Sequence, residues 1–232
     1  MGSEPAAFLS ALRLSDSFLP VGGYTASYGL EQYLNEGRLE DGEELRELLA
    51  AYLRRLVGPA ETVALANANR ASAAGDLEGI LAVDERLHAL TMPREFRESA
   101  TKAGAKLCEL FLEDGELDAA GVAFARRVAD GETPGGYPVA FGVVARRQGV
   151  EPLEAALAHA HGFVTGLLGA AQRLGRFGHT EIQAILEALQ PTIVAVCERH
   201  VDAEPAAMAS FAPLAEIMGM RHERGERRLF VS

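Results

Sequence analysis

The sequence predicts an all-α protein, a single-domain bundle of roughly ten helices around one buried central helix. Hydrophobic residues make up 48% of the 232 residues, but aromatic residues only 6%, and Trp is absent. Ala and Leu must therefore form most of the core, which favours helix over strand. Apolar residues recur at steps of three and four along most of the chain. No segment shows a convincing alternation of apolar and polar residues, and no internal repeat is evident.

The central helix is expected over residues 151–174. Its apolar stripe follows steps of three and four through Leu153, Leu157, Ala160, Val164, Leu167, Ala171 and Leu174. The opposite face carries small residues, namely Ala155, Ala158, Gly162, Thr165, Gly166 and Gly169. Because each Gly costs a helix about 1 kcal/mol relative to Ala, we expect another backbone to approach this face closely. His159, His161 and Gln172 interrupt the apolar run, which is too short for a membrane span.

The first half of the chain divides at Pro, Gly and capping residues. A short helical pattern covers 6–14, and another helix ends at 34–37. Asp41 or Gly42 opens a helix that Gly58-Pro59 is expected to stop. Further helical patterns cover 60–74 and 77–90, separated by the turn and cap at Gly75-Asp76. Residues 15–31 read either as a connector or as a binding loop, since an apolar, aromatic, Gly-containing loop is unusual for mere linkage.

The second half continues the helical pattern. In order, the expected helices cover 95–112, 117–128, 139–149 leading into the central helix, 181–201 with a kink at Pro191, and the short 214–220. The Gly- and Pro-rich loop 131–138 is the best candidate for a mobile segment or a subdomain boundary. Both sides of this loop have similar compositions, so one domain over 1–232 is predicted.

Charge and cysteine content exclude several classes of protein. The net charge of −11 argues against a general nucleic-acid or anionic-membrane binder. Cys108 and Cys197 have no C-x-x-C spacing, so a secreted disulfide framework is not indicated. The first residues lack a basic segment typical of a signal peptide. A cytoplasmic protein is therefore expected.

No motif predicts catalysis or a bound cofactor. The chain lacks a G-x-x-x-x-G-K-[ST] phosphate loop and a G-x-S-x-G elbow. His159 and His161 are two residues apart and do not share a helical face. Glu85 and His88 have one copy of the Glu-x-x-His spacing of di-iron bundles, which need two copies and two further Glu residues. We therefore expect no catalytic residues, no cofactor and no metal site, and a binding or assembly role.

Five segments in order give the sequence a specific resemblance. They are Leu14–Glu31, with the pattern L-x-S-x-x-L-P-V-G-x-x-x-x-S-x-G-L-E; Pro93–Ser99 with Gly104; Pro138–Gly142; Arg173-Leu174; and the tail with His222-Glu223 and Arg228-Leu229-Phe230. Together they resemble the UreF family of urease accessory proteins over nearly the whole chain. The sequence departs from the family pattern at 176–179, where Pro-Leu-Gly-Gln is usual, and at Val231, where Arg is usual.

The resemblance implies an all-α, commonly dimeric protein without catalysis of its own. Members of this family join UreD, also called UreH, and the GTPase UreG. The assembly delivers nickel to apo-urease, whose active-site lysine must be carbamylated. The expected partners are thus a UreD/UreH-like protein, UreG, apo-urease and a second copy of the chain, with no nucleic acid and no membrane.

The C-terminal tail, residues 221–232, is the expected partner-binding segment. It carries four Arg residues on an acidic protein and ends in three apolar residues, a combination that can order on a partner. With the loop near Pro20, the resemblance gives the partner-binding set as Pro20, Gly22, Tyr24, Tyr28, Glu31, Arg94, Glu95, His222, Glu223, Arg228, Leu229 and Phe230. Two alternatives remain open: a helical metal-containing enzyme of the di-iron type, and a purely structural helical oligomer.

Overall fold

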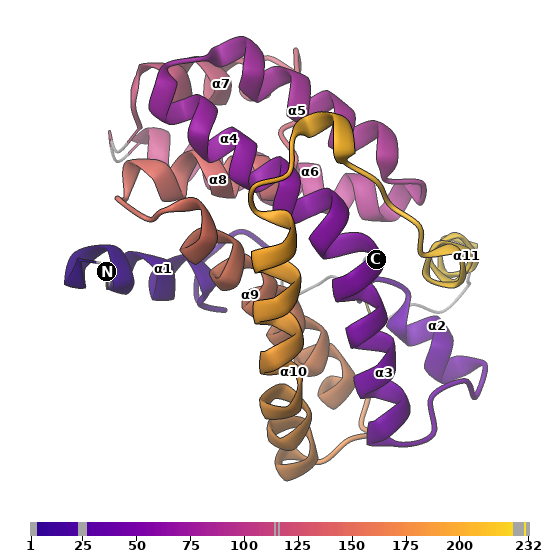
Figure 1. The fold of residues 1–232 in the computed structure, drawn as a ribbon. Coiled ribbons are helices and arrows are strands. Elements are labelled where there is room, and N and C mark those ends of the chain that lie inside the picture. The colour runs from indigo at the N-terminus through magenta and orange to yellow at the C-terminus, as the bar shows by residue number, and fades with distance from the viewer. Residues whose placement is uncertain (1–3, 23–26, 114, 116, 225–229, 231–232) are drawn as a thin grey trace.

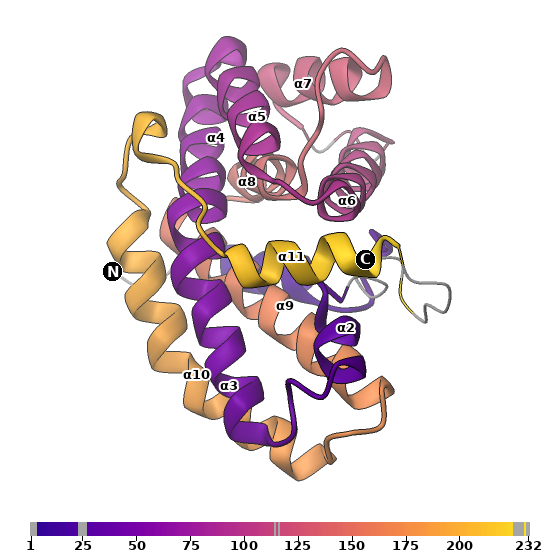
Figure 2. The same ribbon diagram turned by 90° about the vertical axis from the view of Figure 1, so that its right-hand side faces the viewer.

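The computed structural model describes residues 4–22, 27–113, 115, 117–224 and 230. Within these residues every regular element is a helix and no strand occurs, which confirms the all-α prediction. Figure 1 shows α1 projecting from one side of the molecule, and Figure 2 shows α11 lying across the opposite side, between α6 and α2. None of the helices in this part of the chain has the length and apolar character that a membrane span requires.

The N-terminal helices are α1 (Pro5–Ser15), α2 (Leu30–Asn35) and α3 (Gly42–Tyr52). Asp41 is the N-cap of α3, and its carboxylate accepts a hydrogen bond of 2.9 Å from the Glu44 amide. This cap is the boundary that the sequence predicted, because a side-chain acceptor satisfies an amide that has no partner within the helix.

The expected stop at Gly58-Pro59 is wrong. The chain stays helical through a π-helical segment, η2 (Leu53–Thr62), and continues directly into α4 (Val63–Ala74). Pro59 has no N–H to donate to the Arg55 carbonyl four residues earlier. The Phe211 amide donates to that carbonyl instead, at 3.1 Å. A distant segment thus satisfies the group that would otherwise have ended the helix.

In the upper part of the bundle in Figure 1, α4 lies with α5 (Leu77–Leu90), α6 (Arg94–Glu113), α7 (Ala119–Ala129) and α8 (Tyr137–Arg147). The loop before α8, expected as a mobile segment or boundary, is anchored by the buried Asp84. Its carboxylate accepts hydrogen bonds from Thr133 Oγ1 and from the amides of Gly135 and Gly136, at 2.7, 2.7 and 2.8 Å. The loop is therefore fastened to α5 at three points.

The central helix is α9 (Pro152–Arg173), followed by α10 (His179–His200), the 3₁₀ turn η3 (Pro205–Ala207) and α11 (Pro213–His222). The predicted apolar stripe of α9 is buried at Ala160, Val164 and Leu167. The small face differs from the prediction. A Cβ added at Gly166 would meet no atom of the described residues within 4 Å.

The core consists mainly of Leu, Ala and Val side chains from every long helix, as the composition predicted. Its largest fully buried side chains include four phenylalanines, Phe96, Phe111, Phe124 and Phe141. Both cysteines, Cys108 and Cys197, are buried and unpaired. Cys197 is thus a core residue of α10.

Candidate functional site

Five of the predicted partner-binding residues lie together where α2, α6 and α11 meet. They are Glu31, Glu95, His222, Glu223 and Phe230, and we call this group the α2–α6–α11 junction. His222, Glu31 and Glu95 are almost completely buried, with exposed fractions of 2, 4 and 6%. Ionisable side chains are rarely this buried unless they are paired. The junction is therefore the most unusual polar feature among the predicted residues.

His222 connects the three helices through both of its ring nitrogens. Its Nδ1 lies 2.7 Å from Glu95 Oε2, and its Nε2 lies 3.1 Å from Glu31 Oε2. When both carboxyl groups are ionised, both ring nitrogens must be donors, which requires a protonated imidazole. Contacts of this kind hold α11 against α2 and α6, and removing the ring would deprive each of the two buried carboxylates of a close partner.

The junction also fastens the end of the chain. The Phe230 amide donates to Glu31 Oε2 at 3.2 Å, and the Phe230 side chain is 8% exposed. The guanidinium of Arg173, in the last turn of α9, lies 5.0 Å from the centre of the Phe230 ring. In addition, Glu223 accepts a hydrogen bond of 3.1 Å from the Glu95 amide. Phe230, which the sequence left as an exposed apolar residue in need of a partner, is thus buried within its own chain.

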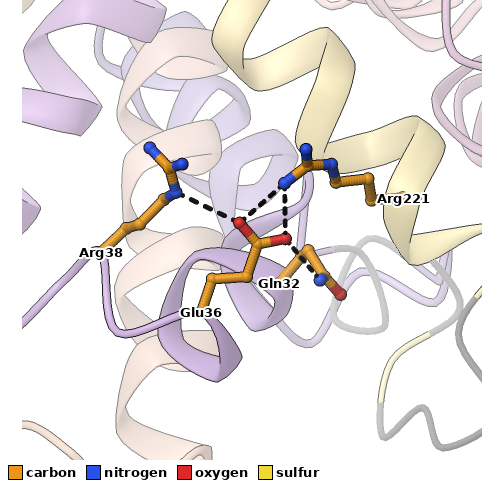
Figure 3. Close-up of polar contacts among 4 residues, drawn as sticks. All are labelled: Gln32, Glu36, Arg38 and Arg221. Carbon is orange, nitrogen blue, oxygen red and sulfur yellow. Dashed lines mark hydrogen bonds and ion pairs between the residues drawn. The ribbon is translucent and has the colours of Figure 1, made fainter.

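A second, exposed set of contacts lies beside the junction (Figure 3). Glu36, just beyond the end of α2, is bound by Arg221 of α11, whose Nη1 lies 2.9 Å from each carboxylate oxygen. Gln32 and Arg38 donate to the same carboxylate at 2.9 and 3.1 Å. The Gln32 hydrogen bond and then the Arg221 contact lower the pKa of Glu36. These contacts set the position of α11 relative to α2, although each is solvent-screened and individually weak.

Two glycines allow the three helices to approach so closely. Gly29, before α2, has a φ of 78°, and a Cβ there would lie 3.0 Å from the Gly219 nitrogen of α11. A Cβ at Gly219 would in turn lie 2.7 Å from Phe96 Cζ of α6. Any larger residue at either position would push α11 away from the junction.

Tyr28 lies under the junction instead of pointing to solvent. Its ring centre is 4.9 Å from those of Phe96 and Phe163, and its carbonyl accepts a hydrogen bond of 2.8 Å from the Tyr52 hydroxyl. Burial, and next the nearby Glu61 carboxyl, raise the pKa of Tyr28 well above its usual range. This residue positions α2 through its packing.

Other predicted residues lie away from the junction. Pro20 and Gly22 are exposed, and Arg94 is exposed at the start of α6, where it pairs with Glu98 at 3.7 Å. Tyr24, Arg228 and Leu229 fall outside the described residues, so their predicted roles stay predictions. The structure therefore groups the Glu, His and Phe residues of the set and leaves the loop residues separate.

The small face of α9 lines a groove with a volume of about 570 Å³. One wall comes from the end of α1 and the segment after it, including Leu14 and Leu19, and the inner end from Tyr28, Tyr137 and His159. The nearest atoms to a Cβ at Gly162 would belong to Ser15, at 3.7 Å. The groove is thus open along the stretch where the sequence predicted close backbone packing.

The two carboxylates contact opposite nitrogens of the His222 ring. The three side chains therefore do not face a common point that a metal ion could occupy. Within the described ranges, no group of three or more His, Cys, Asp and Glu side chains is arranged to hold a metal ion. Glu85 and His88 of α5 are both exposed. The described residues thus contain no ligand cluster of the kind that the di-iron alternative requires.

Several residues of the site were not predicted from the sequence. Glu36, Gln32 and Phe96 were missed as members, and so was the close approach of Gly29 and Gly219. Gln32 and Glu36 have the i, i+4 spacing of a helical side-chain pair, which was an available signal. The pairing of Glu31 with His222, which are 191 residues apart, had no local signal at all.

The fold and the junction together define an all-α protein whose C-terminal segment is fastened to its second helix by buried, paired charges. The family model of UreF matches residues 39–190. The urease accessory protein UreF of Trichodesmium erythraeum is 33% identical over 235 residues, covering 100% of both chains. Urease accessory protein UreF 1 of Brucella melitensis is 32% identical, covering 97% of this chain and 92% of that protein. The UreF protein of Yersinia enterocolitica is 29% identical, covering 94% and 95%.

This chain belongs to the UreF family of urease accessory proteins. The resemblance seen in the five sequence segments is thereby confirmed. The matches extend over the α2–α6–α11 junction as well as the helical bundle, since they cover nearly the whole chain.

Proposed function

We propose that this chain is a cytoplasmic component of nickel insertion into urease, which bridges a UreD/UreH-like protein and the GTPase UreG. In this role it governs the GTP-dependent delivery of nickel to apo-urease and catalyses no reaction itself. Membership of the UreF family supports the link with urease maturation. The α2–α6–α11 junction is the observation that carries the bridging role, because it fixes one helix so that an apolar face stays exposed.

That face belongs to α11 and the residues before it. Phe211, Leu214 and Ile217 are 70, 45 and 46% exposed, and they follow a spacing of three residues. The opposite side of α11 is buried at Ala215, Met218 and His222. An exposed row of large apolar side chains on a firmly held helix is typical of a protein–protein contact. We assign this surface to the UreD/UreH-like partner.

UreG supplies the nucleotide site in this scheme. The chain has no phosphate loop, whose backbone amides and Lys hold the phosphates of a nucleotide. We therefore expect the isolated chain neither to hydrolyse GTP nor to bind it tightly. Saturable micromolar binding of GTP to the isolated chain in calorimetry would contradict the assignment of the nucleotide site to UreG.

A second copy of the chain is the proposed occupant of the groove along α9. The face lined by Gly162 and Gly166 is open within one chain, and small residues let two backbones approach closely. Gly166→Leu should therefore convert the dimer to a monomer in light scattering while leaving the helix content in circular dichroism unchanged. A dimer of unchanged mass in this variant would exclude the groove as the contact.

The partner surface is tested with Leu214→Glu and Ile217→Glu. Both side chains are half exposed, so a charge there should leave the fold intact but disrupt an apolar contact. We expect pull-down of the UreD/UreH-like protein and activation of urease in co-expressing cells to fall at least tenfold. Circular dichroism should remain that of the unmodified chain.

Val194→Glu is the matched control. Val194 lies on α10 and is 42% exposed, close to the exposure of Leu214 and Ile217. This variant carries the same change of charge and should bind the partner normally. Equal loss in the control, or full binding by both α11 variants, would refute the assignment of the α11 face.

A further inference from the structure

A buried carboxyl group and a buried imidazole face each other between η2 and α9. Glu61 Oε2 lies 3.8 Å from His159 Nε2, and the two residues are 9 and 5% exposed. Glu61 Oε2 and His159 Nδ1 have no hydrogen-bond partner within the described residues. Buried polar atoms in proteins are nearly always bonded, so this pair needs an explanation that packing alone does not provide.

The surroundings of the pair are apolar and aromatic. The rings of Tyr137 and Phe141 lie 5.8 and 5.5 Å from the His159 ring. Arg97 lines the same small pocket as Glu61 but donates to the carbonyls of Thr91 and Met92. Other titratable groups that line the two spaces or lie on elements packed against the pair include Tyr28, Tyr52, His88, Tyr137, His161, Cys197 and His200.

The pair separates two spaces of very different size. Glu61 lines a small pocket of about 30 Å³, and His159 lines the inner end of the groove of about 570 Å³. Tyr28 and Ala100 line both spaces and therefore form the wall between them. The small pocket has room for about one water molecule. A small displacement of the two side chains would connect it with the open groove.

The charge state of the pair depends on one proton. With this proton the pair is neutral overall, whether the proton resides on Glu61 or on His159. Without it, a net negative charge lies in the core, where it is strongly disfavoured. Burial raises the pKa of Glu61 to about 7 and lowers the pKa of His159 to about 4, so both groups favour their neutral forms.

We propose that Glu61 and His159 form a proton-operated latch, which holds η2 against α9 while the proton is present. Loss of the proton admits water to the wall between the small pocket and the groove. The π-helical geometry of η2 makes it the element that yields in this proposal, because π-helical segments are rare and frequently occur at functional sites. The latch therefore links pH near neutrality to the shape of the groove's inner end.

Hydrogen exchange of the full chain tests the latch. We expect the opening equilibrium that exposes the amides of residues 53–62 to be at least tenfold larger at pH 8 than at pH 6, after correction for the intrinsic exchange rate. Glu61→Gln, which keeps the shape but has no proton to lose, should abolish this difference. Glu78→Gln on α5 is the control and should behave like the unmodified chain. An opening that does not change with pH in the unmodified chain would overturn the latch.

A second measurement needs no variant. In the chain labelled with ¹³C at glutamate carboxyl carbons, one resonance should titrate near pH 7, together with a shift of the His159 ring signals. Assignment comes from the disappearance of that resonance in Glu61→Gln. Titration of every glutamate below pH 5.5 would overturn the proposal even if the Gln variant did not fold.

Discussion

At the scale of single residues, buried carboxylates of this protein are held by different numbers of donors. Asp84 accepts three hydrogen bonds, from Thr133 Oγ1 and two loop amides. Glu61 faces only the His159 ring, at a distance longer than a hydrogen bond. The first arrangement fixes a loop, and the second leaves a group whose charge state responds to pH.

Replacing Asp84 should be among the most damaging single changes in the chain. Asp84→Ala leaves three buried donors without an acceptor, and we expect the free energy of unfolding to fall by about 3 kcal/mol. Asp76→Ala is the control, because it removes only the exposed N-cap of α5 and should cost about 1 kcal/mol. Urea unfolding of both variants measures the difference. Equal losses would show that the loop is not held by Asp84.

The Glu61–His159 pair predicts two opposing dependences of stability on pH. The folded pKa of Glu61, about 7, lies above its ordinary 4.5, so its contribution is full below pH 4.5 and is lost as the pH rises to 7. The folded pKa of His159, about 4, lies below its ordinary 6.5, so its contribution is full above pH 6.5 and is lost as the pH falls to 4. The two slopes oppose each other between pH 4.5 and 6.5.

Each single variant should expose one of these slopes. As the pH rises from 4.5 to 6.5, the free energy of unfolding of Glu61→Gln should increase and that of His159→Gln should decrease. Each change should be on the order of 2 kcal/mol relative to the unmodified chain. Urea unfolding at half-unit steps of pH measures both. Parallel curves for the three proteins would show that neither group changes its pKa on folding.

At the scale of the elements, helices were predicted well where their ends are set by local chemistry. Asp41 and Asp76 are N-caps because their carboxylates bond amides three residues ahead, which a sequence displays directly. Pro59 misled the prediction because the Arg55 carbonyl is satisfied by Phe211, a residue about 150 positions later in the chain. The small residues on one face of α9 were recognised from the sequence. The sequence of α9 does not determine, however, which segment packs against that face.

The same reasoning applies to the candidate site. The resemblance supplied Glu31, Glu95 and His222 as partner-binding residues, and the structure brings them into mutual contact. Their contact depends on how α2, α6 and α11 meet, which no local pattern encodes. Glu61 and His159 were missed as a pair for the same reason, since their contact depends on how η2 and α9 pack.

Two glycine substitutions should have opposite effects on helix stability. A Cβ at Gly58 in η2 would clash with Val196 and His200 of α10, so Gly58→Ala should destabilise the fold by about 1–3 kcal/mol. A Cβ at Gly166 in α9 meets nothing, so Gly166→Ala should stabilise the single chain by about 0.5–1 kcal/mol. Thermal unfolding at low protein concentration compares them. A destabilised Gly166→Ala monomer would mean that the groove is filled within one chain.

At the scale of the whole molecule, the junction determines where the C-terminal tail can be cut. Deletion of 221–232, the whole predicted tail, removes His222 and Phe230 and with them the contacts that these residues make with Glu31 and Glu95. We expect this truncation to unfold at markedly lower urea concentration, with a loss of about 3 kcal/mol or more. Deletion of 225–232 keeps His222 and should retain the helical bundle by circular dichroism.

The shorter truncation is thus the suitable test of the tail in partner binding. It should fail to capture the UreD/UreH-like protein although its helices remain folded. Normal capture by the 225–232 deletion would assign partner binding to α11 alone. Equal stability of the two truncations would show that His222 does not hold α11 in place.

The contacts of Glu31 also determine when the junction can form during synthesis of the protein. Glu31 pairs with His222, 191 residues later, and with the Phe230 amide, 199 residues later. At about 5–20 residues per second, a ribosome needs roughly 10 to 40 s to make that interval, and the exit tunnel delays the last residues further. Until residues 222 and 230 have been made, Glu31 lacks these two contacts, so the junction cannot close around α2. The junction therefore closes only on full-length chains, and a truncated translation product would keep α2 exposed to proteases and chaperones.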